Sequence, residues 1–396
     1  MSANEHSWPA GDVCGVPLVA YGNVVEALSR VGIECSFDTF TARSFVSGPG
    51  LGAQPKLLNA DSVSDIRHRL WEQLHIDFGR PLIRDACDYL CRQNSFHAVL
   101  DELSKTEWDR EERIGRLLER YAGVPHEPYH GSVARRALVA AIRLLRSPGV
   151  QVDYSWVLQG PQESGKTSFV RILGGDWYGE GDLLRKNEQQ IQEALRLFWL
   201  YEIAEAGSLH RADERAVKAI ISRRDDGGRR AYGHDFEHQP RHTFLFITTN
   251  DAIFLKDRTG NRRFHITPFS KLDRDALERD RAQIWAEAMY LEQNGLSIQV
   301  PRKHRAAAEA ARESAMQIDP WISILSTIKS DIIGGEQRVS NADVLAHLGI
   351  SKDRQSIAQL HRAAECMLQL GWERGGPFKI GRHTVRGFKR NAPEGT

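Results

Sequence analysis

The sequence predicts an α/β protein with a parallel central sheet, a helical N-terminal domain and a small C-terminal domain. Three observations lead to this fold class. Apolar residues recur at helical spacing before residue 149, and short apolar strands alternate with helices between residues 149 and 300. A glycine-rich loop also joins the first of these strands to the helix after it. The 396 residues are enough for more than one domain.

The N-terminal part divides into two segments. Residues 1–60 show no sustained periodicity, and Pro49–Pro55 is typical of a loop, so we expect this segment to be weakly structured. Residues 61–148 predict a helical domain whose apolar stripes are more typical of core packing than of a partner surface. The stripes are Ile66, Leu70 and Leu74; Phe96, Val99, Leu100 and Leu103, with Asn94 or Ser95 as the cap; Ile114, Leu117, Leu118 and Tyr121; and Val133, Ala137, Ala140, Ala141 and Leu144.

The central domain, residues 149–300, is expected to contain three buried strands. Aromatic and β-branched residues mark them at Tyr154–Leu158, Leu197–Tyr201 and Thr243–Thr248. Helical segments separate the strands, which favours a parallel sheet with crossover helices.

A phosphate-binding loop follows the first of these strands. The glycines of this loop let backbone N–H groups turn towards phosphate oxygens, and the helix that follows adds its positive end. Lys166 would neutralise the terminal phosphates and Thr167 would ligate Mg²⁺, so the expected ligands are ATP and magnesium. The loop and the residue after it are Gly160, Pro161, Gln162, Glu163, Ser164, Gly165, Lys166, Thr167 and Ser168.

Polar residues follow the other two strands and complete the predicted site. Glu202 ends the second strand and is assigned to the magnesium shell, while Glu205 is the candidate for polarising the attacking water. Asn250 follows the third strand and could orient that water. Arg262 and Arg263 lie on a Gly-Asn turn and suit developing phosphoryl charge. Each acid could instead be a solvated helix-start residue, and the arginines a solvated turn.

Composition sets limits on partners and location. A net charge of +1 means that any nucleic-acid surface must be local. The five cysteines show no second pair or histidine cluster that would complete a metal site, although Cys87 and Cys91 share a helix face. The N-terminus lacks the pattern of a signal peptide, and there is no apolar run long enough to span a membrane, so a cytoplasmic protein is expected.

Together these segments resemble the virulence-associated E family of phage and mobile-element proteins, which are AAA+ ATPases near the superfamily 3 helicases. The resemblance covers about residues 64–390. It implies that Lys166 and Thr167 are Walker A residues, that Glu202 and Glu205 are Walker B acids, and that Asn250 is the sensor. The motifs that carry it are Asn94–His97, Trp108-Asp109, Gly160–Thr167, Glu202–Glu205, Lys218, Asp226, Arg229, Tyr232-Gly233, Thr248–Asn250, Gly260–Phe264 and Trp285–Ala288.

The resemblance also implies an assembly and a DNA contact. Arg262 or Arg263 would be an arginine finger supplied in trans, within a homo-oligomeric ring that we expect to be a hexamer. Superfamily 3 helicases carry a DNA-gripping hairpin in the stretch that lies between Lys218 and Thr243 here, although such a basic run is usually a solvated face. Its basic residues are Arg223, Arg224, Arg229, Arg230, His234, His238 and Arg241, of which Arg229, Arg230 and His234 are the candidate DNA contacts.

The C-terminal region, residues 320–396, resembles a winged helix. Helices are expected at about Trp321–Lys329, Asn341–Leu348 and Gln355–Leu370, with a Gly-rich basic hairpin after Gly371. Between residues 374 and 390 there is no Asp or Glu, which fits phosphate contacts from a wing, although winged helices also bind proteins. The candidate DNA contacts of this hairpin are Arg382, Arg386 and Lys389.

The resulting functional hypothesis is an ATP-driven, DNA-binding motor in the style of a replicative helicase or helicase loader of a phage, satellite or mobile element. Single-stranded or forked DNA is the expected partner, with a separate primase or replication protein, because relatives carry a primase domain that this chain lacks. Glu163 and Ser164 also depart from residues common in relatives. The alternatives are a nucleotide-switched assembly or anti-phage defence ATPase without unwinding activity, and, least favoured, a small-molecule P-loop kinase.

Overall fold

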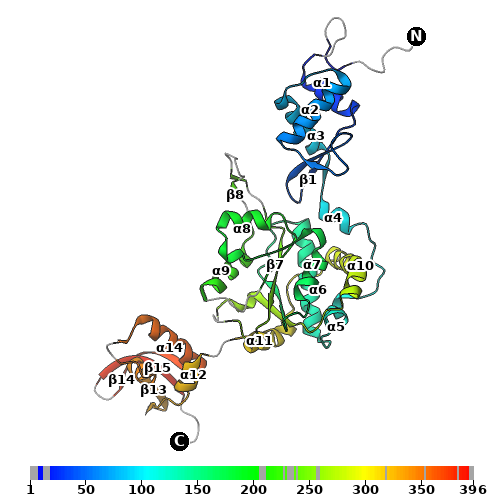
Figure 1. Cartoon of the computed structure of the whole chain (residues 1–396). Helices are drawn as coiled ribbons and strands as arrows, with labels where there is room; N and C mark the ends of the chain where they lie inside the picture. The colour runs from blue at the N-terminus through cyan, green and yellow to red at the C-terminus, as the bar shows by residue number, and fades with distance from the viewer. Residues whose placement is uncertain are drawn as a thin grey trace, which may run out of the picture. The chain divides into compact units, whose positions relative to one another are not determined.

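The computed structural model describes residues 8–11, 18–204, 211–225, 228–229, 236–237, 240–255, 259–316, 319–351, 354–380 and 383–391. The chain divides into two compact units, Met1–Ala315 and Met316–Thr396. Figure 1 traces the elements of both units in chain order.

The first unit begins with a small α/β subdomain, drawn in blue in Figure 1. Its sheet has the order β3-β2-β1-β4, in which β1 pairs antiparallel with β2 and parallel with β4. Side chains from α1, α2, α3 and the strands form one apolar cluster, including Leu28, Ile66 and Leu70. The elements are α1 (Tyr21–Arg30), β1 (Glu34–Asp38), β2 (Arg43–Ser47), β3 (Lys56–Leu57), α2 (Ala60–Leu74), α3 (Arg80–Gln93) and β4 (Ser95–Phe96).

The prediction that residues 1–60 are weakly structured is wrong for residues 21–57, which hold α1 and three strands. These strands are at most five residues long and mix charged residues with apolar ones, so they give little periodic signal. Their apolar side chains, such as Cys35 and Val46, are buried only once the strands pair and α3 covers them.

The helical segment that follows leads to the central sheet. His97 caps α4 (Ala98–Leu103) by accepting from Leu100 N, so the predicted caps Asn94 and Ser95 are wrong. Asn94 instead ends α3, and Ser95 begins β4. The remaining elements are η1 (Ile114–Arg116), α5 (Leu117–Ala122) and the long, largely buried α6 (Pro128–Arg146).

The central sheet has five parallel strands in the order β11-β5-β10-β7-β6, which confirms the predicted parallel pairing. The three predicted strands correspond to β5 (Ser155–Gln159), β7 (Leu200–Ile203) and β10 (Phe244–Thr249). The two edge strands, β6 (Tyr178–Glu180) and β11 (Phe264–Pro268), were not predicted. Helices α6, α7 and α10 pack together against this sheet (Figure 1).

The helices around the sheet are α7 (Lys166–Gly174), α8 (Glu188–Leu195), α9 (Arg211–Ser222), α10 (Arg274–Gln293) and α11 (Arg305–Ser314), with short 3₁₀ turns η2 (Gly175–Trp177), η3 (Leu183–Arg185), η5 (Asn261–Arg263) and η6 (Arg302–His304). A hairpin of β8 (Gly228–Arg229) and β9 (Phe236–Glu237) extends between α9 and β10. Aromatic packing fills the core, with the rings of Trp156 and Phe246 5.5 Å apart and those of Trp199 and Trp285 4.3 Å apart.

The described residues of the second unit form an antiparallel sheet and three helices. The sheet order is β12-β13-β15-β14, and its core includes Val339, Met367 and Phe388. The predicted basic hairpin is present as β14–β15. Gly371, just after the helix Ile357–Gln369, adopts a φ of 78°. The elements are α12 (Pro320–Leu325), β12 (Asp331–Ile333), β13 (Glu336–Ser340), α13 (Asn341–His347), α14 (Ile357–Gln369), β14 (Glu373–Ile380) and β15 (His383–Asn391).

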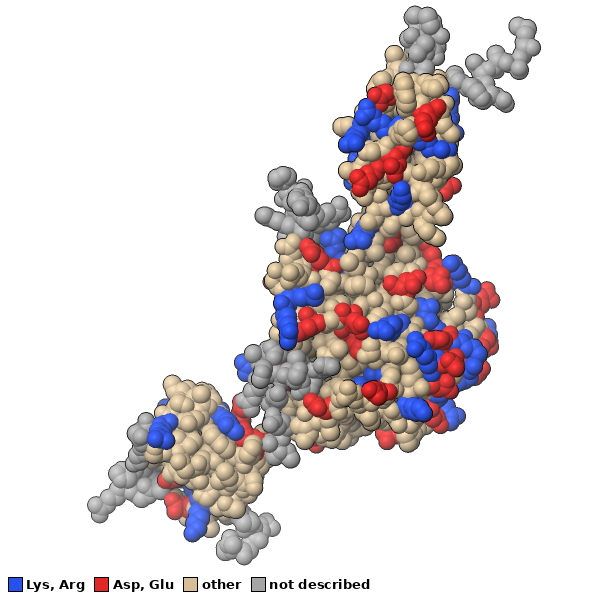
Figure 2. Space-filling view, in the orientation of Figure 1, with Lys and Arg blue, Asp and Glu red and all other residues tan. Residues whose placement is uncertain are grey.

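Surface charge is mixed. Figure 2 shows acidic and basic side chains interleaved over the visible face of the first unit, in keeping with the net charge of +1. Within the described residues, none of the helices has the length and apolarity that crossing a membrane requires.

Candidate active site

The glycine-rich loop lies between β5 and α7, where packing demands its glycines. A Cβ at Gly160 would collide with the carbonyl oxygen of Phe269, and one at Gly165 would lie 2.6 Å from the Leu272 Cβ. Gly165 also has a φ of 94°, which disfavours other residues. Leu272 N donates to Ser164 O at 2.9 Å, so the segment before α10 fixes the outer side of the loop.

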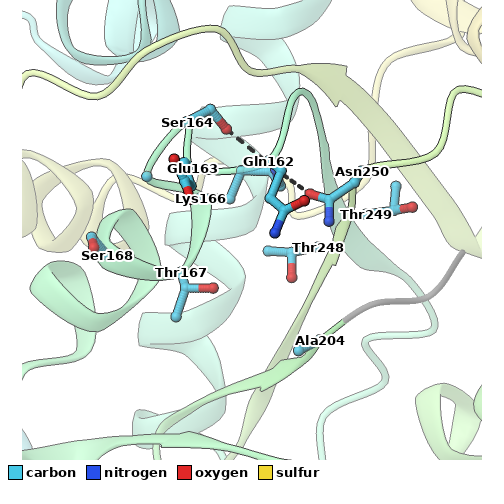
Figure 3. A pocket seen from close by; sticks show the side chains of 11 residues that line it. Gln162, Glu163, Ser164, Lys166, Thr167, Ser168, Ala204, Thr248, Thr249 and Asn250 are labelled. Carbon is cyan, nitrogen blue, oxygen red and sulfur yellow. Dashed lines mark hydrogen bonds between the residues drawn. The ribbon is translucent and has the colours of Figure 1, made fainter.

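Lys166 is folded onto its own loop. Its Nζ lies 2.9 Å from Gly160 O, 2.7 Å from Pro161 O and 3.2 Å from Ser164 Oγ. Asn250 Oδ1 accepts from the same ammonium at 2.9 Å, which brings the tip of β10 to the loop (Figure 3). Burial lowers the pKa of Lys166. The ammonium is therefore fixed by oxygen atoms at the place where phosphate oxygens could replace some of them.

Glu202 sits beside the start of α7 with both carboxylate oxygens hydrogen-bonded. Its Oε1 accepts from Thr167 Oγ1 at 2.8 Å and from Thr248 Oγ1 at 2.6 Å, and its Oε2 accepts from the Tyr178 hydroxyl at 2.6 Å. The Glu202 residue is fully buried at the end of β7. A carboxylate next to a hydroxyl provides the hard oxygen ligands that Mg²⁺ prefers, so these residues fit the metal.

A cavity of about 350 Å³ opens beside Lys166, Thr167 and Asn250 (Figure 3). Glu202 lies behind this lining and reaches it through its hydrogen bonds to Thr167 and Thr248. It lies at the carboxyl ends of β5, β7 and β10, where ligands bind in open parallel sheets. Its lining is Gln162, Glu163, Ser164, Gly165, Lys166, Thr167, Ser168, Ala204, Thr248, Thr249 and Asn250. The predicted residues Lys166, Thr167, Glu202 and Asn250 are thus brought together, whereas Glu205 lies outside the described residues.

Glu163 adopts a φ of 62°, the left-handed region that a β-carbon disfavours. It is exposed at the rim of the loop, so the carboxylate is solvated and only the backbone is strained. The departure noted in the sequence therefore costs conformational energy, on the order of 1 kcal/mol, without closing the cavity.

The two adjacent arginines differ in their surroundings. Arg263 Nε donates to Ser222 Oγ at 2.7 Å, which ties η5 to the last residue of α9. Lys218 Nζ, also on α9, donates to Thr259 O at 2.6 Å and pairs with the buried Glu214. Arg262 is exposed and has no hydrogen bond or ion pair with any residue that the structure describes. Helix α9 thus anchors the turn and leaves one arginine projecting.

The predicted DNA contacts fall in two places. Arg229 lies in β8, while Arg230, His234 and Arg382 lie outside the described residues. Arg386 is exposed on β15, but Lys389 is half-buried and its Nζ lies 2.9 Å from Glu336 Oε1. Arg241, counted among the basic residues of the hairpin region, is buried and donates to Ile220 O at 2.6 Å, so it caps α9.

Two residues of the site were missed from the sequence. Tyr178 lies on β6, which at three residues is too short to show a strand period. Burial and hydrogen bonding to the two nearby carboxylates raise the pKa of Tyr178, so its hydroxyl remains a donor. Ser222 gave no signal because a serine at the end of a helix is common in any protein.

The family model of the virulence-associated protein E-like domain matches residues 101–317. The chain belongs to this family. The match of this virulence-associated E-like chain includes the phosphate loop, the tips of β7 and β10, and the arginine turn. The matched segment thus spans the whole candidate site.

Solved structures of the NrS-1 C-terminal region have a similar fold. The virulence-associated E-like chain is similar to an apo structure of the NrS-1 C-terminal region, with a TM-score of 0.54 at 12% identity, covering 92% of this chain and 98% of that one. A second form of that region gives a TM-score of 0.51 with the same coverage. JCV helicase gives a TM-score of 0.31 at 12% identity, over 78% of this chain and 97% of that one. The search of curated proteins finds no match.

Proposed function

We propose that the chain hydrolyses ATP with Mg²⁺ at the loop of residues 160–167. The observation that carries the proposal is the meeting of Lys166, Thr167, Glu202 and Asn250 at one edge of the parallel sheet. A lysine, a hydroxyl, a carboxylate and an amide in this arrangement are the groups that phosphoryl transfer to water requires.

Each residue has a separate task in this proposal. Lys166 exchanges loop oxygens for phosphate oxygens, and Thr167 and Glu202 hold the metal. When bound, Mg²⁺ supplies positive charge against the phosphates. Asn250 orients the attacking water from the tip of β10, and Glu205 polarises that water.

We further propose that Arg262 is the arginine finger and acts on a neighbouring subunit. Its exposure supports this role, because a finger must leave its own chain to reach another site. Arg263, bonded to Ser222, would then hold the turn in place. A finger in trans requires a head-to-tail contact, which forms a ring where the rotation between subunits closes.

DNA is the proposed partner, and an AAA+ replicative motor the proposed class. Support comes from the family and from the β8–β9 hairpin, which carries Arg229 in the stretch where the sequence resemblance to superfamily 3 helicases implies a DNA-gripping hairpin. We also propose that the second unit is winged-helix-like and that its Arg382 and Arg386 bind DNA. A separate primase is proposed as a further partner.

The test is ATP turnover by the purified chain with and without single-stranded DNA, together with strand displacement on a forked duplex. A motor requires turnover that DNA stimulates and unwinding that depends on ATP. Lys166→Ala is the matched control, because it removes the ammonium from the loop and leaves every proposed DNA contact intact. Unwinding by the Lys166→Ala chain would refute the proposal.

A nucleotide-switched assembly is the second candidate, and the surface of α14 favours it. Ile357 is 76% exposed and Leu368 is 46% exposed on this helix. Arg362 on the same helix is paired with Asp319 at 2.8 Å, so it is not available to a phosphate. Exposed apolar side chains at the two ends of this helix suit a protein partner better than DNA. Slow turnover that DNA does not stimulate would support this candidate.

A further inference from the structure

Tyr178 enters the site from an element that carries no recognised nucleotide-binding motif. It lies on β6, which pairs in parallel with β7 so that Glu180 is opposite Glu202. Residues two apart in a strand share a face of the sheet, so Tyr178, Glu180 and Glu202 all project from the same face. Helix α7 fixes the ring, because Gly174 leaves room for the Tyr178 Cβ and the Arg171 guanidinium lies 5.4 Å from the ring centre.

The Tyr178 hydroxyl lies 2.6 Å from Glu202 Oε2 and 2.6 Å from Glu180 Oε2. A phenol has one proton to donate, so it serves one carboxylate at a time. Glu180 is exposed, and Arg171 Nη2 lies 3.1 and 3.2 Å from its two oxygens. Glu202 is buried, and Tyr178 is the only donor to its Oε2 among the described residues. The Tyr178 hydrogen bond therefore stabilises the Glu202 carboxylate more than the Glu180 carboxylate.

The three hydroxyls around Glu202 fix its carboxylate completely. Thr167 and Thr248 hold Oε1, and Tyr178 holds Oε2, so the carboxylate plane cannot turn without breaking a hydrogen bond in a buried site. Without the Tyr178 hydroxyl, Oε2 would be buried and unsatisfied, which favours rotation of the carboxylate.

We propose that Tyr178 is a positioning residue that orients the Glu202 carboxylate for a divalent cation, through a hydrogen bond delivered from β6. Tyr178 touches neither nucleotide nor metal in this role. The inference rests on the proposed nucleotide site, because Glu202 is its metal-binding acid. Partners that orient ligating groups typically change metal affinity by about 10- to 100-fold when they are removed.

The experiment measures metal binding without turnover. The full chain is titrated with a fluorescent non-hydrolysable ATP analogue, first in EDTA and then at increasing Mg²⁺. Tyr178→Phe keeps the ring and its packing and removes the hydroxyl alone. Two controls accompany it: Glu180→Gln, which leaves the donor to Glu202 in place, and Tyr201→Phe, which removes a hydroxyl from the neighbouring strand.

The expected result is that Tyr178→Phe raises the half-saturating Mg²⁺ concentration about tenfold or more, with unchanged affinity in EDTA. Both controls should keep the wild-type Mg²⁺ dependence. The inference is overturned if Tyr178→Phe has the wild-type dependence, if it loses as much affinity in EDTA as in Mg²⁺, or if Glu180→Gln causes the same loss. A wild-type chain that binds no analogue under either condition would instead overturn the proposed function itself, and this inference with it.

Discussion

Alanine substitutions at the two arginines of η5 should affect the rate of ATP hydrolysis differently, because only one of the arginines is anchored within its own chain. Arg262 is exposed and projects from the turn, whereas Arg263 bonds to Ser222. Arg262→Ala should leave nucleotide affinity unchanged, since its own phosphate loop is complete. It should lower the rate of hydrolysis by about 10³-fold or more, the usual contribution of an arginine finger.

Ser222→Ala should lower the rate of hydrolysis less than Arg262→Ala does, because it removes the anchor of the turn and keeps Arg262 itself. It removes the 2.7 Å hydrogen bond to a guanidinium that is only partly buried, together with the 3.0 Å bond from Ser222 Oγ to Lys218 O within α9. A partly exposed bond of this kind contributes about 1 kcal/mol, which corresponds to about a fivefold loss of rate if the turn is misplaced in proportion. The ratio between the two variants therefore separates contact with the phosphate from support of the turn.

The assay mixes Arg262→Ala chains with Lys166→Ala chains, neither of which should hydrolyse ATP alone. In an equal mixture, about one junction in four pairs an intact loop with an intact finger from its neighbour. Turnover should rise towards that fraction and should depend on protein concentration. Mixing Ser222→Ala with Lys166→Ala is the matched control, because the activity already present limits the gain there to a few-fold.

The reasoning would be refuted by either of two results. If labelled subunits exchange and the mixture stays as inactive as its parts, the site is not shared between chains. If Arg263→Ala loses as much as Arg262→Ala while Ser222→Ala loses nothing, Arg263 rather than Arg262 contacts the phosphate.

Other parts of the chain give further tests. Glu202→Gln should bind nucleotide in EDTA but lose most of the gain from Mg²⁺, because an amide is a weak ligand for that metal; analogue titration measures both. Arg386→Ala should lower the salt slope of duplex binding by about one, whereas Lys389→Ala should leave it unchanged because Glu336 already pairs with that lysine. Burial lowers the pKa of His265 to about 4, so the unfolded chain takes up that proton first and stability should fall as pH drops below about 6.5. Thermal melts should show a shallower fall for His265→Phe, and an identical fall would exclude His265 as its cause.

The parts of the site that the sequence could predict are those that follow from strand geometry. A carboxylate and an amide at the ends of two parallel strands must lie near a loop at the end of a third, and Glu202 and Asn250 do. The short strands could not be predicted, because segments of at most five residues show little or no period and their pairing depends on neighbours distant in sequence. That is why β6 and Tyr178 were missed.

The other source of error was that basic residues were grouped by charge alone, without knowledge of which ones are buried or paired. Arg241 and the basic residues near it looked alike in the sequence, yet Arg241 is buried and holds carbonyls at the end of α9. Lys389 was grouped with Arg386 for the same reason, although an acid on a neighbouring strand pairs with it. Such differences arise from tertiary contacts, and a count of basic residues cannot reveal them.

Helix α9 has a consequence for the order of events in an assembly. Its C-terminal end holds the arginine turn through Ser222, and the β8–β9 hairpin is the next element along the chain, so this helix lies between the two. In a ring where Arg262 serves the next subunit, a pull on the hairpin would reach the neighbour's catalytic centre. We expect Ser222→Ala to weaken DNA stimulation more than basal turnover, and equal loss of both would contradict this link. DNA binding by one subunit would then control when its neighbour hydrolyses ATP, and the path of the DNA strand would set the order of hydrolysis around the ring.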